Sequence, residues 1–277
     1  MGIHRHLVVV GAQAALLCAS LFGQAPAAAL KPSPEVQPDT SQAAEKKEIT
    51  RKARAAYYNL KNEGLTDFQC QVLPDWDAVY KAMPQDALGQ EQVLPVLKNV
   101  HFQITTSSVS HQPDVTSANE VVADRLQKTI RDVEAVLKAF LNEWELFVVA
   151  SPFPEVDGDY QIQEIGGKYH LTFKRGANEI STTMDRDFRV EELTFSSDKV
   201  NGTVLPILET GKHGFVLVGY NAIFLGDGNS VLQKDIRIET QEVEGVQLPK
   251  ALKATFPLGT GKVTLTFVFT NCQVKKR

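Results

Sequence analysis

The sequence has little of the chemistry that marks common enzyme families. Three cysteines occur among 277 residues, and no two of them form a C-x-x-C pair. H-E-x-x-H and G-x-S-x-G are absent, and the four histidines beyond residue 30 do not stand at zinc-ligand spacing: His101, His111, His170 and His213. We therefore expect a protein that is not an enzyme, with no metal and no cofactor. A site assembled in space from serine, histidine and carboxylates stays open, so a secreted hydrolase is retained as the least favoured alternative.

An excess of charge is also missing. The chain carries 29 basic and 33 acidic residues, a formal net charge of -4, and no basic stripe. This balance argues against nucleic acid as a partner and against broad adhesion to anionic membranes. With 43% hydrophobic and 22% charged residues the composition is that of an ordinary globular protein, long enough for one domain with its own core.

The longest apolar run lies at the start of the chain, at Leu7–Gly23. Arg5 precedes it, and Gln24–Ala29 offers small residues for cleavage after Ala27 or after Ala29. This layout predicts a cleavable signal peptide over residues 1–29, hence a periplasmic or extracellular protein without a transmembrane span after cleavage. An uncleaved anchor is the alternative, but the run is short for a bilayer. Lipoprotein processing at Cys18 is rejected, because bulky leucines directly precede that cysteine.

Three prolines in residues 30–40 predict an extended tether, which leaves residues 41–277 as a single domain. Helical periodicity predicts a first helix over Ser41–Glu63, ended by Gly64, and a shorter one over Gln85–Leu97. The longest helix is predicted over Ala118–Phe147, with a capping box at Ser117–Glu120. Asp75 or Asp77 is interpreted as the cap of a further short helix rather than as part of a carboxylate pair.

Strands are predicted from period-two alternation. Leu65–Val72 and Val100–Val109 come first, Ser107–Thr116 is expected to form a loop, and a train of short strands follows over Tyr160–Val274. The predicted fold class is α+β: a curled antiparallel sheet, an incomplete β-barrel of about nine to eleven strands, covered by the N-terminal helix and the long inserted helix.

Two positions in this train carry sharper expectations. Asn201-Gly202 is the sequence of a tight hairpin turn. Phe215–Phe224 is apolar on both faces, so we expect a central strand that is covered on both sides, with Gly219 at a bulge or close approach.

Cys70 and Cys272 are the only cysteines after the leader. In an oxidising compartment two such residues usually pair, which predicts a disulfide between the first and last strands. Two buried free thiols are the alternative.

The order of elements resembles the periplasmic lipoprotein carrier superfamily, with the LolA/LolB-like fold. The most similar stretches are Gly167–Phe173, Met184–Val190 and Val243–Pro249, whose G-x-x-L-P turn precedes a closing strand pair in that family as well. The resemblance covers residues 45–274 and rests on order and pattern. The Gln85–Pro113 region has no counterpart there, and the family's gating arginine matches no position here.

This resemblance implies a half-barrel that binds acyl chains, with a lipid or an acylated protein as partner. The candidate lining residues are apolar side chains of the sheet and the long helix: Phe140, Trp144, Phe173, Phe195, Phe215, Leu217, Phe224 and Phe267. The competing interpretation is that these side chains are simply core. An envelope scaffold with the same fold and no cargo is the corresponding alternative function.

Overall fold

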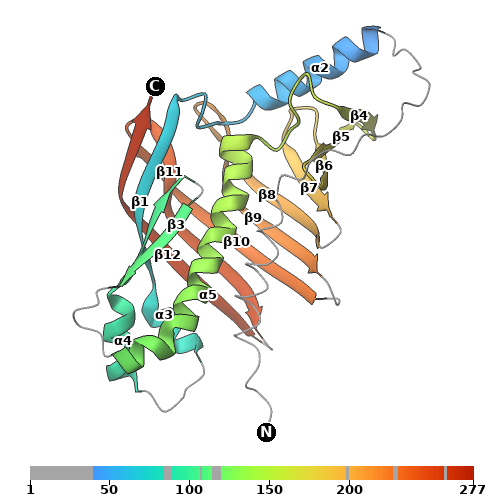
Figure 1. The fold of residues 1–277 in the computed structure, drawn as a ribbon. Coiled ribbons are helices and arrows are strands. Elements are labelled where there is room, and N and C mark those ends of the chain that lie inside the picture. Colours follow the sequence, from blue (N-terminus) through green and yellow to red (C-terminus); the bar gives the residue numbers. More distant parts are fainter. Residues whose placement is uncertain are drawn as a thin grey trace.

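A computed structural model describes residues 40–83, 89–106, 108–113, 120–197, 200–226, 230–258 and 261–277. The predicted signal peptide, the tether and the Ser117 capping box lie outside these residues. The architecture is one open antiparallel sheet with a few helices, in which twelve strands follow the order β3-β2-β1-β12-β11-β10-β9-β8-β7-β6-β5-β4 (Figure 1). The predicted α+β class is confirmed at this level.

The strands lengthen along the chain. Short ones come first: β1 (Leu65–Pro74), β2 (Val100–Thr105), β3 (Ser108–Pro113), β4 (Tyr160–Ile165), β5 (Lys168–Arg175), β6 (Asn178–Met184) and β7 (Val190–Ser196). Long ones form the C-terminal half: β8 (Val200–Gly211), β9 (Gly214–Gly226), β10 (Ser230–Val243), β11 (Val246–Leu258) and β12 (Gly261–Lys276). Consecutive strands pair with each other except β3 and β4, which are the two edges of the sheet, and β1 also pairs with β12, which joins the two ends of the domain.

Two predictions about the strands were wrong. Ser108–Pro113 was expected as loop but pairs with β2 as an edge strand, which brings the sheet to twelve strands. Asn201-Gly202 was expected as a turn but lies inside β8, where Gly202 sits opposite Phe195. A Cβ at Gly202 would come within 2.2 Å of that ring, so the glycine makes room for an aromatic side chain rather than for a turn.

The helices are α2 (Thr40–Ala55), α3 (Trp76–Ala82), α4 (Gln90–Lys98) and α5 (Glu120–Glu145), which continues into a π-helical turn, η2 (Leu146–Ala150). Asp75 caps α3 by accepting a hydrogen bond from the Ala78 backbone N–H at 3.0 Å, as predicted. The first helix ends eight residues earlier than Glu63, because the chain beyond Ala55 pairs with the sheet.

The segment Ala56–Leu60 closes one end of the sheet. Phe215 N–H donates to Ala56 O at 2.7 Å, and Tyr58 N–H donates to Phe215 O at 3.0 Å. Gly214, with φ of 109°, permits this approach, since a Cβ there would stand 2.4 Å from Ala56 O. Helix propensity favoured continuation of α2, but these long-range backbone bonds replace the helical ones.

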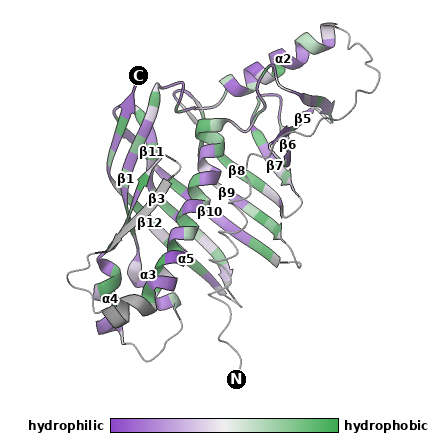
Figure 2. Cartoon of the chain, viewed as in Figure 1, coloured by the Kyte–Doolittle hydropathy of each residue, from purple (hydrophilic) through white to green (hydrophobic). Residues whose placement is uncertain are grey.

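The long helix α5 crosses one face of the sheet, with α3 and α4 near one of its ends and α2 beyond the other (Figure 1). Hydrophobic and hydrophilic residues alternate along α5 and along β8–β10 (Figure 2), as expected for elements with one buried face. The ring centroids of Phe68 (β1) and Trp144 are 5.9 Å apart, and those of Phe140 and Phe269 (β12) are 6.3 Å apart. These contacts pack α5 against β1 and β12, the two strands that join the chain's ends.

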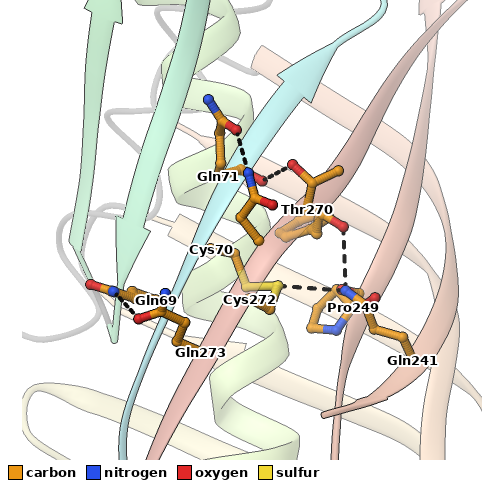
Figure 3. The surroundings of a disulfide bond; sticks show 10 residues. Gln69, Cys70, Gln71, Gln241, Pro249, Thr270, Cys272 and Gln273 are labelled. Carbon is orange, nitrogen blue, oxygen red and sulfur yellow. Dashed lines mark hydrogen bonds between the residues drawn. A yellow bond between two sulfur atoms is a disulfide. The ribbon is translucent and has the colours of Figure 1, made fainter.

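Cys70 and Cys272 form a disulfide across β1 and β12, with a sequence separation of 202 and an S–S distance of 2.07 Å (Figure 3). The predicted pairing is confirmed. The ladder shifts register between Gln69 and Gln71, and Asn271 has φ of 51°, so a β-bulge turns Cys272 toward Cys70. Gln241 Nε2 lies 3.5 Å from Cys272 Sγ and also donates to Pro249 O, which ties β10 to the same point.

Among the helices that the structure describes, none combines the length and the apolar character needed to cross a membrane.

Candidate functional site

A small apolar cavity lies between the end of α5 and the inner face of β5–β9. Its volume is about 40 Å³. The helical side contributes residues of the last α5 turn and of η2, and the sheet contributes residues of five consecutive strands: Asn142, Glu143, Leu146, Phe147, Arg175, Asn178, Ile180, Leu193, Phe195, Val204 and Tyr220. Only a few polar groups point into an otherwise hydrophobic wall, which is the composition of small-molecule sites.

Of the eight predicted lining residues, only Phe195 reaches this cavity. Phe140 and Trp144 of α5 are 1% and 2% exposed and pack against the β1 and β12 rings. Phe267 is fully buried on β12. At that end of the sheet the space under α5 is filled with side chains, so these three residues are core.

The remaining predicted residues do not line the cavity. Phe173 lies under the Arg175 guanidinium, whose Cζ is 5.6 Å from the ring centroid. The ring centroids of Phe224 and Phe195 are 5.6 Å apart, and Leu217 is buried in the domain's core cluster. The ring centroids of Phe215 and Tyr57 are 5.4 Å apart, where the segment Ala56–Leu60 meets the sheet.

A buried polar cluster joins α5 to the sheet at the cavity wall. Glu143 accepts hydrogen bonds from Tyr220 Oη on β9 and from Lys234 Nζ on β10. Lys234 is 4% exposed and Glu143 is 7% exposed, and the ammonium also lies 4.7 Å from the Phe224 ring centroid. A charge buried this deeply requires a partner of opposite sign, so the Glu143–Lys234 pair fixes which face of α5 meets the sheet.

Arg175, at the end of β5, is the second polar group of the wall. Its Nη2 donates to Ser151 O at 2.9 Å. Its Nη1 is buried and has no hydrogen-bond partner among the described residues. Burial lowers the pKa of the Arg175 guanidinium, and the nearby Arg54 acts in the same direction, while Glu155 opposes them. The cation is thus held in a site that disfavours its charge.

The segment Ser151–Glu155 forms the outer side of this corner. Arg54 donates to Phe153 O and Pro154 O, and its Nη2 contacts Glu155 at 3.1 Å. An open groove of about 420 Å³ lies beyond this segment, between it and the end of α2. Arg51, Arg54 and Lys61 line that groove. The cavity and the groove are thus separated by one short stretch of chain.

That stretch begins with irregular backbone. α5 ends in the five-residue π-turn η2, and the next residue, Ser151, has φ of 77°, in the left-handed region that serine rarely adopts. π-Turns and such outliers cluster at functional sites and hinges. Thr182 Oγ1 of β6 and Arg175 both bond to the carbonyls of residues 151–152, which holds this conformation.

Two adjacent tyrosines clamp the two halves of the sheet at this end. The Tyr57 hydroxyl accepts a hydrogen bond from Val190 N–H of β7 at 2.7 Å, and the Tyr58 hydroxyl accepts one from Gln247 N–H of β11 at 2.8 Å. Burial raises the pKa of both phenols, more strongly for Tyr57. The hydroxyl oxygens act as acceptors in these contacts, so burial, and not the hydrogen bonds, disfavours the ionised form.

The face of the sheet that is turned away from α5 is partly exposed to solvent. Ile223 and Leu225 of β9 are 47% and 48% exposed, and Val231 of β10, which pairs with Leu225, is 63% exposed. The expectation that Phe215–Phe224 is covered on both sides is therefore correct only for its first half: the adjacent Val216 and Leu217 are both buried, whereas Ile223 reaches solvent. The expectation for Gly219 is confirmed, since the β8–β9 register shifts beside it and a Cβ would stand 2.4 Å from Ile236 O.

The sequence contained a signal for the missed polar residues. Lys234 alternates in phase with Leu232, Ile236 and Ile238, all inward-facing. Glu143 stands three residues after Phe140 and four before Phe147, inside the apolar stripe of α5. One charge of each sign at an inward position is the pattern of a buried ion pair. Arg175 gave no such signal, because it borders a glycine turn.

Comparisons with known proteins identify no relatives: no family model, no curated protein and no solved structure matches the chain. The resemblance to the lipoprotein carrier superfamily thus stays a prediction. No group of three histidine, cysteine or carboxylate side chains stands close enough to hold a metal ion in the part of the chain that the structure describes.

Proposed function

We propose that this protein is a non-enzymatic binding protein for a lipid or for the acyl chain of a lipoprotein. The observation that carries the proposal is the apolar cavity between α5–η2 and β5–β9, with two charged groups in its wall. A hydrophobic ligand would enter between the helix and the sheet, where it gains the free energy of burying its own apolar surface.

The size of the cavity defines how such a ligand would bind. Small-molecule sites hold roughly 300–1,000 Å³, whereas this cavity holds about 40 Å³. Binding therefore requires η2 to move away from β6–β8. The irregular backbone at Leu146–Ser151 supports a hinge there, and the buried contacts of Phe140 and Trp144 support a fixed α5 up to that point.

The same proposal places the protein outside the cytoplasm, in the periplasm or beyond the cell, as a LolA/LolB-like half-barrel. The disulfide supports this placement, because disulfides persist in oxidising compartments and are rare in the cytosol. The partner would be a lipid or an acylated protein. No role for nucleic acid or for a bound cofactor is proposed.

Binding is tested with the delipidated full chain, using a fluorescent fatty-acid probe and native mass spectrometry. Val204→Phe fills the cavity from β8, and we expect it to weaken probe binding about tenfold or more. The matched control is Thr203→Phe, which adds the same ring to the opposite face of the same strand. An unchanged affinity in Val204→Phe, or no probe binding by the wild-type protein, would refute a ligand site at this place.

A scaffold with the same fold and no cargo is the second candidate. The filled interior beneath Phe140, Trp144 and Phe267 favours it, since little space is left under most of α5. It predicts that native mass spectra contain no lipid and that a stable protein partner is recovered by cross-linking.

A further inference from the structure

The strongest unexplained feature of the molecule is one nitrogen atom. Arg175 is one of the residues that line the apolar cavity, and its Nη1 is buried and donates to no described acceptor. An unsatisfied buried donor costs on the order of 1–3 kcal/mol, and more when it is charged. The other cation in this region, Lys234, is satisfied by Glu143, so the same wall contains one completed and one incomplete charged site.

The charged groups that act on Arg175 do not supply a hydrogen-bond acceptor for its Nη1. Arg54 and Glu155 act on the guanidinium from the outer side of the Ser151–Glu155 segment, and Glu155 is itself bonded to Arg54. Arg175 Nη2 is directed to Ser151 O, which orients the planar group. The Phe173 ring lies 5.6 Å from its Cζ. The guanidinium is thereby held in place at the cavity wall, and its Nη1 lacks an acceptor.

We propose that Arg175 Nη1 binds the anionic head group, carboxylate or phosphate, of an acyl-chain ligand whose tail occupies the adjoining cavity. This inference rests on the proposed lipid-binding function and specifies its ligand class as an anionic amphiphile. The head group supplies the acceptor that the guanidinium lacks, and a hydrogen bond between two charged groups is stronger than a neutral one. The tail would displace η2 and contact Leu193, Val204 and Phe195.

The test compares three probes of equal chain length on the full, delipidated protein: palmitate, palmitoyl lysophosphatidic acid and methyl palmitate. The wild-type protein should bind at least one anionic probe about tenfold to a hundredfold more tightly than the neutral ester. The two anionic arms distinguish a fatty-acid carboxylate from a phosphate head group.

Two substitutions assign the preference to Arg175. Arg175→Gln should abolish the preference for the anionic probes over methyl palmitate, while Arg175→Lys should retain part of it. The control is Arg186→Gln, which removes an exposed arginine that pairs with Glu164 on the same sheet. Circular dichroism melts verify that each variant is folded.

The outcomes separate the two proposals. Absence of binding for all three probes contradicts the lipid-binding function itself. Equal affinity for anionic and neutral probes in the wild-type protein overturns the role of Arg175 while the binding function stands. The role is also overturned if Arg175→Gln keeps the full anion preference. A measurement on the wild-type protein alone is decisive even if Arg175→Gln does not fold.

Discussion

At the β1–β12 end of the sheet, α5 meets the strands through aromatic rings and the disulfide lies directly below. Phe68, Trp144, Phe140 and Phe269 interlock there, and all four are no more than 2% exposed. At the β5–β9 end the same helix meets a cavity, an ion pair and an arginine with a free nitrogen. One helix thus crosses a closed region and an incompletely filled one.

This difference indicates where the molecule can move. Cores at full packing density resist local opening, whereas regions with few apolar contacts open at lower free energy. Phe140 and Trp144 anchor one face of the last turns of α5, and the π-turn η2 follows directly after them, next to the cavity. A protein that must admit a hydrophobic ligand requires both: a rigid frame and one corner that opens.

The largest expected effect is on the closed end. Cys70→Ala/Cys272→Ala removes a cross-link over 202 residues, for which the loop-entropy model gives about 5 kcal/mol of unfolding free energy. Denaturant unfolding of wild-type and variant protein measures it. Ligand binding at the far end should survive under native conditions, and its loss in the folded variant would contradict the independence of the two regions.

The second prediction concerns the Glu143–Lys234 ion pair, which joins α5 to the sheet at the cavity wall. Glu143→Gln leaves Lys234 buried without a counter-charge and should cost about 3–5 kcal/mol of unfolding free energy. The double variant Glu143→Gln/Lys234→Met should recover much of that loss, because no uncompensated charge remains. Urea denaturation measures the unfolding free energy of both variants. A double variant as unstable as the single one would show that the ion pair itself stabilises the fold, and would contradict an origin of the loss in the uncompensated charge.

Matched valine substitutions compare the packing directly. Val72→Ile adds a methyl group to the closed end and should cost about 1–3 kcal/mol through overpacking. Val204→Ile adds the same group at the cavity and should be neutral or stabilising by up to about 1 kcal/mol. Thermal and urea unfolding measure both, and equal destabilisation would mean that the cavity accepts no additional atoms.

The smallest effect concerns the tyrosine clamp that links β7 and β11. Burial raises the folded-state pKa of Tyr57 above its unfolded value near 10, so the unfolded state loses its proton first as the pH rises. Its contribution to stability is complete below about pH 10 and declines above it, by about 1.4 kcal/mol between about pH 9 and pH 11.

Tyr57→Phe provides the control for this pH dependence. The variant should be less stable at neutral pH, because Val190 N–H loses its acceptor, and should show a shallower alkaline decline. Urea midpoints across this pH range measure the slope. An unchanged slope would assign the alkaline loss to other groups, with Tyr58 the next residue to substitute.

Local pattern predicted much of the frame. Alternation placed Phe68, Cys70 and Val72 on one buried face, and all three are there. Helical periodicity predicted a helix over Ala118–Phe147, and α5 with η2 covers Glu120–Ala150. The pairing of Cys70 with Cys272 followed from their number and the inferred compartment.

The site followed less well. Aromatic residues were chosen because they are apolar and lie on strands, yet only Phe195 lines the cavity. Arg175 lies beside a glycine turn, and its place in the cavity wall depends on β5 meeting η2, two elements more than twenty residues apart. No property of residues 168–176 alone determines that meeting.

The sequence by itself determined the periods, the capping Asp75 and the cysteine pair, because each depends on neighbours along the chain or on composition. Only the tertiary structure decided that Tyr57 leaves the helix, that Gly202 makes room for Phe195, and that Arg175 keeps one nitrogen without an acceptor. These outcomes depend on pairing between distant segments, where burial and backbone hydrogen bonds override local propensity.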